Sequence, residues 1–246
     1  MTNIVITGNE EITHRIKELL KNIVNLNTDT FSKDINFEKV LWVTPLSILP
    51  LAANITKKMN ENPKLNIIYP APSGRYFESY LKSIKFPKGL DQYLFNQDST
   101  YIPILHLNLQ NKEQKNVAEI AINKYVSFLK NILKDQDFKE NIENAIGYVI
   151  HEIIDNVFHH STSQSFWILA QYWKSKKQIE ICLLDEGNGF KKAYQNAETP
   201  INPKDDIEAI KYALNSTSSK QSYIDSERRY GIRTSLKLIT ESELNG

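Results

Sequence analysis

Residues 151–160 read HEIIDNVFHH, and this stretch decides how the C-terminal half of the chain is expected to fold. Its branched apolar residues continue a pattern of helical spacing that covers about residues 142–157. At about 100° per residue, Asn156 lies about 40° from Glu152 around such a helix, and His159 lies about 20° to the other side. The helix should therefore present a carboxylate, an amide and an imidazole along one edge.

This polar edge allows three interpretations. It is the solvated face of an amphipathic helix, the wall of a site for a small polar ligand, or part of a zinc site that uses His159 and His160. Zinc is the least favoured, because adjacent residues point in different directions on a helix and the chain has no H-E-x-x-H spacing. Taken alone, the helix favours the solvated face.

A second feature follows 29 residues after Asn156 and changes this balance. The stretch CLLDEGNGF (182–190) places Asp185, Gly187 and Gly189 directly after an apolar strand. A carboxylate at a strand end can accept hydrogen bonds from a ligand, and alternating glycines let the backbone approach that ligand closely. A β-hairpin is predicted between the helix and this loop. The order of helix, hairpin and glycine loop is more specific than either motif alone.

The combination resembles the ATPase superfamily shared by DNA gyrase, the large heat-shock chaperones, sensor histidine kinases and mismatch-repair proteins (GHKL). The positions that match its N-box and first glycine box are Glu152, Asn156, His159, Asp185, Gly187 and Gly189. RRYGIRTSLKLI (228–239) stands where the family's second glycine box opens a helix, and Gly231 matches the second glycine. Arg229 departs from the family pattern, because many relatives have the first glycine of that box there.

The resemblance implies a role for each matched residue. Asn156 would be a ligand of Mg²⁺ that bridges the ATP phosphates, Asp185 would accept a hydrogen bond from the adenine amino group, and Glu152 would activate water. Gly187 and Gly189 would allow close approach and movement of a lid. The remaining nucleotide contacts would come from His159, Lys220, Gly231 and Ile232, of which Lys220 lies in a stretch that also fits a plain flexible loop.

The first 95 residues show another pattern, in which short β-branched runs alternate with amphipathic segments. Strands are expected over about 3–7, 37–44 and 64–70, and helices over about 10–23, 47–59 and 75–84. This order predicts a small α/β layer that loosely resembles the STAS-like domains of bacterial regulators, or a structural cap with no regulatory role. We expect a domain of residues 1–95 and an ATPase domain of residues 96–246. Overall, this predicts an α/β protein whose second domain is a two-layer sandwich, with a mixed sheet covered by helices on one face.

The composition of the chain limits which partners and which cellular compartment are expected. Thirty basic and 29 acidic residues give a net charge of +1, which gives no sign of a nucleic-acid partner. The single cysteine, Cys182, excludes an intrachain disulfide and favours a reducing, cytoplasmic setting. The longest apolar region, 40–55, contains two prolines and is too short to cross a membrane, and the N-terminus has no signal-peptide pattern.

The sequence leaves the output of nucleotide binding open. ATP hydrolysis, phosphoryl transfer to a serine or histidine of a partner, as in anti-sigma-type relatives, and an ATP-gated interaction module all fit. A protein partner and a homodimer are both compatible with the chain. An autophosphorylating histidine kinase is disfavoured, because His151 lies inside the N-box. The chain stops at Gly246, where relatives add further strands, so we expect a truncated or differently completed sheet.

Overall fold

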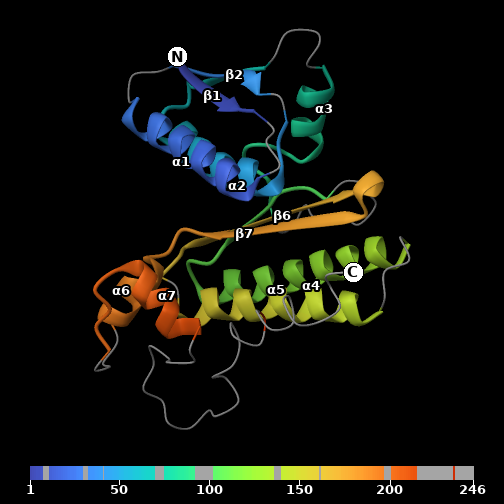
Figure 1. The fold of residues 1–246 in the computed structure, drawn as a ribbon, viewed down its shortest axis with the longest axis vertical. Helices are drawn as coiled ribbons and strands as arrows, with labels where there is room; N and C mark the ends of the chain where they lie inside the picture. Colours follow the sequence, from blue (N-terminus) through green and yellow to red (C-terminus); the bar gives the residue numbers. More distant parts are fainter. Residues whose placement is uncertain are drawn as a thin grey trace. The chain divides into compact units, whose positions relative to one another are not determined.

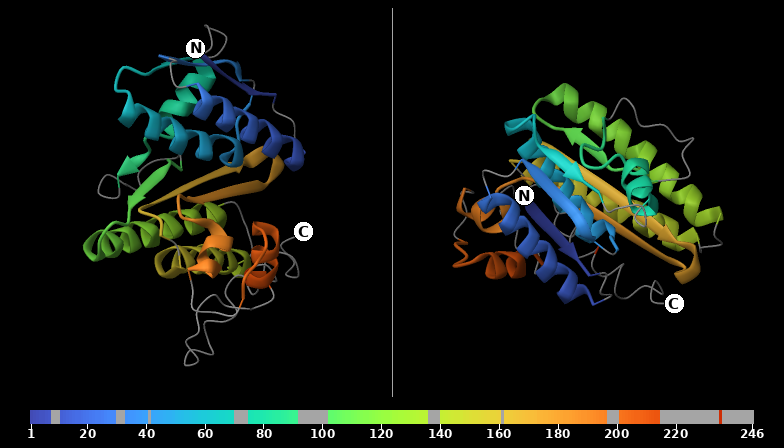
Figure 2. Two further views of the ribbon diagram at one scale, coloured as in Figure 1. Left: turned by 90° about the vertical axis from the view of Figure 1, so that its left-hand side faces the viewer. Right: turned by 90° about the horizontal axis from the view of Figure 1, so that it is seen from above.

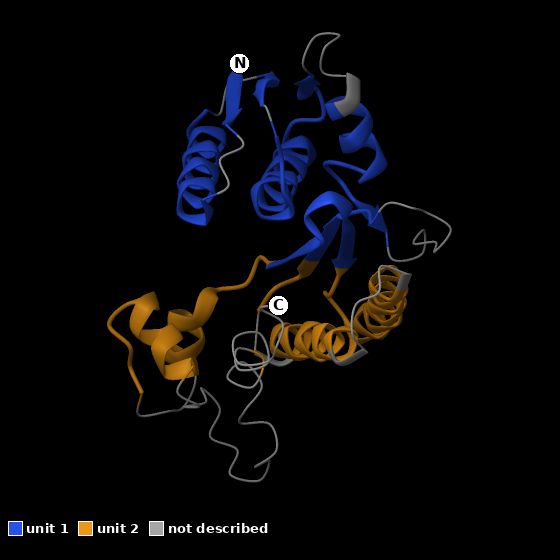
Figure 3. Cartoon of the chain, turned by 45° about the vertical axis from the view of Figure 1, so that its right-hand side comes forward, with its two compact units in different colours: residues 1–107, 167–184 blue, residues 108–166, 185–246 orange. Residues whose placement is uncertain are grey.

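The chain is an α/β structure with two sheets, one of three parallel strands and one of four mixed strands, each with helices (Figure 1). This confirms the predicted α/β class. The computed structural model describes residues 1–7, 11–29, 33–40, 42–69, 75–91, 102–135, 140–160, 162–196, 201–214 and 235. The expected domain boundary near residue 95 lies outside these residues. Two compact units, coloured separately in Figure 3, comprise residues 1–107 with 167–184 and residues 108–166 with 185–246.

The three-stranded sheet belongs to the first unit. Its strands, in spatial order, are β1 (Thr2–Ile6), β2 (Asp34–Val40) and β3 (Asn66–Ile68), and both pairs are parallel. Parallel neighbours need a crossover, and the two crossover helices are α1 (Ile12–Thr28) and α2 (Pro45–Glu61). These helices contact each other and lie along the sheet in both views (Figure 1 and Figure 2). A third helix, α3 (Arg75–Ser83), follows β3.

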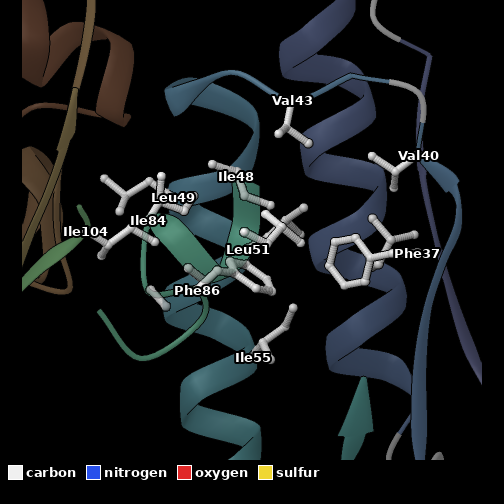
Figure 4. Packing of buried hydrophobic residues seen from close by; sticks show 14 of the residues in the cluster. Phe37, Val40, Val43, Ile48, Leu49, Leu51, Ile55, Ile84, Phe86 and Ile104 are labelled. Carbon is white, nitrogen blue, oxygen red and sulfur yellow. The ribbon is translucent and has the colours of Figure 1, made fainter. Parts of the chain in front are cut away.

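The core of the first unit is built from branched aliphatic and aromatic side chains of these strands and helices (Figure 4). Phe37 of β2 lies at its centre, fully buried, with its ring edge-on to Phe86 at a centroid distance of 5.5 Å. One side of α2 supplies Ile48, Leu51 and Ile55, all fully buried. Spacings of three and four residues place these three side chains on one helix face, as the sequence pattern predicts.

Side chains of α1 close the outer edge of β1. Asn22 is buried and makes two hydrogen bonds with the backbone of Val5: its Oδ1 accepts from the Val5 N–H at 3.1 Å, and its Nδ2 donates to the Val5 carbonyl at 2.8 Å. Glu18 accepts a hydrogen bond from the Thr7 N–H at 3.1 Å. An edge strand with unpaired backbone groups would otherwise recruit another strand. The helix therefore protects β1 from pairing with another chain.

The four-stranded sheet has the order β4 (Leu90–Asp91), β5 (Leu105–Asn108), β6 (Ser165–Trp173) and β7 (Gln178–Asp185). β4 and β5 are parallel, whereas β6 and β7 form a hairpin closed by a short 3₁₀ turn. Lys177 ends that turn in the left-handed region, with φ of 46°. The hairpin is confirmed at the position the sequence predicts, and the two-residue strand β4 is an addition.

Within the first unit, alternate residues of the hairpin contact the N-terminal α/β layer. Trp167 and Leu169 of β6 belong to its hydrophobic core, and the Tyr80 hydroxyl donates to Gln171 at 2.7 Å. On β7, Glu180 accepts a hydrogen bond from the Leu46 N–H at 2.8 Å. Side chains at alternate positions of a strand lie on one face, so one face of the hairpin packs against this layer.

The second unit contains four helices among its described residues: α4 (Lys112–Asp135), α5 (Glu140–His160), α6 (Gly189–Gln195) and α7 (Asp206–Leu214). α4 and α5 are antiparallel, because Lys115 near the start of α4 donates to the Phe158 carbonyl, and Lys130 near its end donates to Asn144. α6 and α7 contact each other at one end of the unit (Figure 1). The centroids of the Tyr194 and Tyr212 rings lie 6.2 Å apart between them.

Three features differ from the sequence prediction. α6 directly follows the glycine loop, where no helix was expected, and α1 continues to Thr28 rather than ending near Ile23. The apolar spacing of α4 groups Ile120 with Ala121, Phe128 and Leu129, and those three are buried whereas Ile120 is exposed. Ala118 and Tyr125 are buried as well, so the buried side of α4 is not centred on Ile120. No helix in the described part of the chain combines the length and hydropathy needed to cross a bilayer.

Candidate functional site

α5 carries Glu152 and Asn156 one helical turn apart, as their spacing predicts. Ile154 and Val157 on the same helix are buried, at 3% and 6% exposure, whereas Glu152 and Asn156 are only half-buried. The branched residues therefore fix the helix against its surroundings, and the carboxylate and the amide lie at the margin between core and solvent. A side chain at such a margin can meet a ligand without first leaving a packed core.

The side-chain amide of Asn156 is the most informative group on this helix. Its Nδ2 atom is buried, and no hydrogen-bond partner for it lies among the described residues. A buried polar atom without a partner costs about 1–3 kcal/mol, so such atoms are uncommon in native structures. The amide can turn about its Cβ–Cγ bond, which brings either oxygen or nitrogen to this position. The arrangement fits a group whose partner is a bound ligand.

Glu152 is held by a residue of its own helix. The Tyr148 hydroxyl, one turn earlier, donates a hydrogen bond to the Glu152 carboxylate. Desolvation, the negative charge of Glu152 and this hydrogen bond together raise the pKa of Tyr148 above its ordinary 10.0. The hydroxyl therefore stays protonated at neutral pH and restricts the directions in which the carboxylate can point.

The donor set at this edge fits magnesium held mainly by a nucleotide. In the part of the chain that the structure describes, no group of three or more histidine, cysteine, aspartate or glutamate residues could hold a metal ion. Mg²⁺ in nucleotide sites is commonly bound by one or two protein oxygens together with phosphate oxygens and water. One amide oxygen from Asn156 is compatible with that pattern. It is not compatible with a metal cage built from protein side chains alone.

The loop after β7 is shaped by its own side chains. Asp185 is exposed at the strand end, and its Oδ1 accepts a hydrogen bond from the Gly187 N–H at 2.8 Å. This local turn fixes the direction of the carboxylate before any ligand arrives. The neighbouring Glu186 makes bonds outside the loop, to Ser163 and Ser165.

Ser163 and Ser165 anchor this loop to the segment that follows α5. The Glu186 N–H donates to Ser163 Oγ at 2.9 Å, and the Ser165 hydroxyl donates to the Glu186 carboxylate. Both serines are at least nine-tenths buried, whereas Glu186 is exposed, so these bonds are partly shielded from water. By helix rise and maximum chain reach, at most roughly 17 Å separates Asn156 from Ser163. Glu186 thus ties the loop after β7 to Ser163 and Ser165, which follow α5 in the chain.

Gly189 uses the conformational freedom of glycine, because its φ is 74°. A side chain added there would meet open space, with Asp206 Oδ1 as its nearest neighbour at 3.9 Å. The constraint is therefore the backbone conformation and not crowding. α6 begins at this residue, and Asp206 accepts a hydrogen bond from the Lys191 N–H at 3.3 Å. Gly187 is not among the glycines with positive φ.

The structure shows the contacts of one histidine of HEIIDNVFHH, His151, but not those of His159. His151 bonds the Gly147 carbonyl through Nδ1 at 2.7 Å and Asn123 Oδ1 through Nε2 at 2.8 Å, so both ring nitrogens are engaged within the α4–α5 pair. The structure describes His159 as helical but does not describe its side chain. The predicted nucleotide contacts of Lys220, Gly231 and Ile232 lie outside the described residues, and Ser235 alone is described in that region, as helical and buried.

Tyr148, Ser163, Ser165 and Glu186 were not identified by the sequence analysis. The Tyr148–Glu152 pair could have been found, because residues four apart on a helix are neighbours. The serine contacts with Glu186 could not, since they join residues 21 and 23 positions apart across a hairpin. No local pattern in the sequence marks such a pair.

Comparisons with protein-family models, with curated proteins and with solved structures found no match to this chain.

Proposed function

We propose that this protein binds ATP with Mg²⁺ at the edge of α5 and at the loop after β7, and that it acts as a cytoplasmic regulatory protein. The observation that carries the proposal is the buried Nδ2 of Asn156, which has no hydrogen-bond partner in the described part of the chain, within the ordered set of N-box and glycine-box residues. A buried amide without a partner costs free energy, which a bound ligand would recover. A ligand with phosphate oxygens and a bound cation would supply its partner.

The anchored loop supports the adenine end of this site. Asp185 is held by its own turn with Gly187, and Glu186 ties the loop to Ser163 and Ser165. A carboxylate fixed in this way can accept a hydrogen bond from an exocyclic amino group without reorganising first. Guanine presents a carbonyl at the corresponding position, so the same carboxylate would repel it. The site should therefore prefer adenine nucleotides.

We further propose that Glu152 activates the water that attacks the terminal phosphate. The Tyr148 hydroxyl donates to this carboxylate and leaves its remaining lone pairs able to accept a proton. When bound, Mg²⁺ neutralises developing charge on the phosphates. The chain itself positions the nucleotide through Asn156 and holds the base at Glu152. Phosphoryl transfer depends mainly on such positioning and charge neutralisation.

Two measurements test this function. Competition between ATP and GTP analogues should show adenine preference in the full chain, and Asp185→Asn should reduce that preference. Phosphate release should then be followed for the parent, for Glu152→Gln and for Asp155→Asn, an exposed neighbour on the same helix. We expect release to fall by about a hundredfold or more in Glu152→Gln and to stay unchanged in Asp155→Asn. Equal rates of phosphate release by all three proteins would show that Glu152 does not activate the water.

A further inference from the structure

α1 leaves a row of large apolar side chains in solvent. Ile12 and Leu20 are each 56% exposed, Val24 is 58% exposed and Ile16 is 39% exposed. Residues four apart lie one turn along a helix and about 40° around it, so these four side chains form one continuous row. We call Ile12, Ile16, Leu20 and Val24 the α1 stripe.

The α1 stripe is distinct from the face with which α1 packs on its own unit. Leu19 and Leu26 are buried in the core, and between them Asn22 closes the edge of β1. Single exposed apolar residues are ordinary on a protein surface, but a contiguous row usually marks an interaction site. α1 thus buries one face in its unit and keeps a second apolar face available.

Within α1, the charges along the solvent side of the stripe have one sign, whereas Glu11 directly precedes Ile12 at the end of the row. Lys17 precedes Leu20 by three residues, and Lys21 precedes Val24 by three, so both ammonium groups border the stripe. Both lysines are exposed. The only acidic residue of α1, Glu18, lies toward β1, where it accepts a hydrogen bond from the Thr7 N–H. The solvent-facing border of the stripe is therefore cationic.

This charge pattern selects among possible occupants. In a symmetric antiparallel pairing with a second copy, the same border of each helix faces its equivalent, which would bring Lys17 and Lys21 of the two copies together. Like charges at such a border disfavour the pairing. A membrane surface is also disfavoured, because the stripe has none of the aromatic residues that anchor interfacial helices. A partner helix with carboxylates along its border would instead match the lysines.

We propose that the α1 stripe docks an amphipathic helix of a partner protein whose apolar seam is bordered by aspartate or glutamate. The inference concerns a surface of the first unit and does not depend on nucleotide binding. The apolar side chains supply the contact area, whereas Lys17 and Lys21 set the orientation and the charge preference of the partner. A helix–helix contact of this kind uses residues that recur about once per turn, as the four residues of the stripe do.

A display library of helical peptides with a fixed apolar seam and randomised border positions tests this proposal, with the full chain as the bait. We expect selection to enrich aspartate and glutamate at the borders. Binding of the selected peptide should weaken about tenfold or more with Leu20→Glu and should not change with Asn25→Ala, at an exposed position on α1 outside the stripe. The combined Lys17→Glu and Lys21→Glu variant should select basic borders instead.

Because the Leu20 side chain is exposed, Leu20→Glu is expected to unfold in urea as the parent does. A loss of binding in this variant would then come from the changed surface and not from a destabilised fold. Failure to enrich any peptide that depends on Leu20 would overturn the proposal, as would enrichment without acidic borders. Self-association abolished by Leu20→Glu would assign the stripe to a second copy. Co-sedimentation with phosphatidylserine vesicles abolished by the same change would assign it to a membrane. Either result would also overturn the acidic partner helix.

Discussion

Arg15 Nη1 lies 2.9 Å from Glu180 Oε2, and this pair joins α1 to β7 across 165 positions of sequence. Both side chains are mostly buried, at 14% and 17% exposure. Glu180 Oε1 also accepts a hydrogen bond from the Leu46 N–H in the first turn of α2, and Arg15 donates to Thr44 Oγ1. One carboxylate therefore links the two crossover helices to the strand that leads into Asp185.

Removing this carboxylate should destabilise the first unit. Glu180→Ala leaves the Leu46 N–H without its acceptor and the Arg15 guanidinium without its charged partner, with Thr44 Oγ1 as its remaining contact, and we expect a loss of about 3–5 kcal/mol in the free energy of unfolding. Glu180→Gln keeps an acceptor for Leu46 and should cost less. Urea unfolding measures both, with Glu119→Ala at an exposed position of α4 as the control. A change below about 0.5 kcal/mol in Glu180→Ala would show that the pair contributes nothing net.

Asn22 should be needed for both stability and solubility. Asn22→Ala leaves the N–H and carbonyl of Val5 unpaired at a sheet edge, which should cost about 2–4 kcal/mol and expose the strand to pairing with other chains. Urea unfolding measures the first effect, and light scattering on mild heating measures the second. Asn25→Ala, at an exposed position on the same helix, should change neither. An Asn22→Ala protein as stable and soluble as the parent would contradict the edge-closing role.

Cys182 should be unreactive while the protein is folded. Burial, and then the charge of Glu180, raises the pKa of this thiol from 9.0 to about 12. Because the folded state holds the thiol proton more tightly, the contribution of Cys182 to stability is complete below pH 9 and is lost as pH rises through about 12. Iodoacetamide at pH 9 should therefore modify the urea-unfolded chain much faster than the folded chain. Equal rates in the two states would refute the burial of this thiol.

The contact between Ser165 and Glu186 should be energetically coupled. A double-mutant cycle of Ser165→Ala and Glu186→Gln is expected to show an interaction of about 1 kcal/mol or more in urea unfolding, because the bond is partly buried and charge-assisted. A parallel cycle of Ser165→Ala with Glu208→Gln, on α7, should be additive. Additivity in both cycles would mean that the glycine loop is not anchored through this bond.

Apart from α6, the helices of this chain could be predicted from the spacing of their apolar residues, but how much of its apolar side each helix buries could not. In α1 the sequence pattern groups Ile12, Ile16 and Leu20 with Leu19, yet only Leu19 is buried. Periodicity records that a helix has an apolar side, whereas tertiary packing decides how much of that side is covered. The short helix α6 escaped prediction because its glycine start is also typical of a loop.

The candidate site also has a part that could be predicted from the sequence and a part that could not. Glu152 and Asn156 lie on one helix, so their shared edge follows from helix geometry alone. The contacts of Glu186 with Ser163 and Ser165, and of Glu180 with Arg15, depend on how strands pair and layers stack. Such contacts join distant positions, and no single local pattern in the sequence specifies them.

Isothermal titration of the full chain with a non-hydrolysable ATP analogue, with and without Mg²⁺, tests the central claim most directly. The matched variants are Asn156→Ala and Asp155→Ala: Asn156 carries the buried amide nitrogen that has no partner among the residues the structure describes, whereas Asp155 is exposed. We predict saturable binding by the parent and by Asp155→Ala, weakened about tenfold or more when Mg²⁺ is withheld or when Asn156 is replaced. No binding by the parent at millimolar nucleotide, or equal affinity for Asn156→Ala and the parent, would contradict the account.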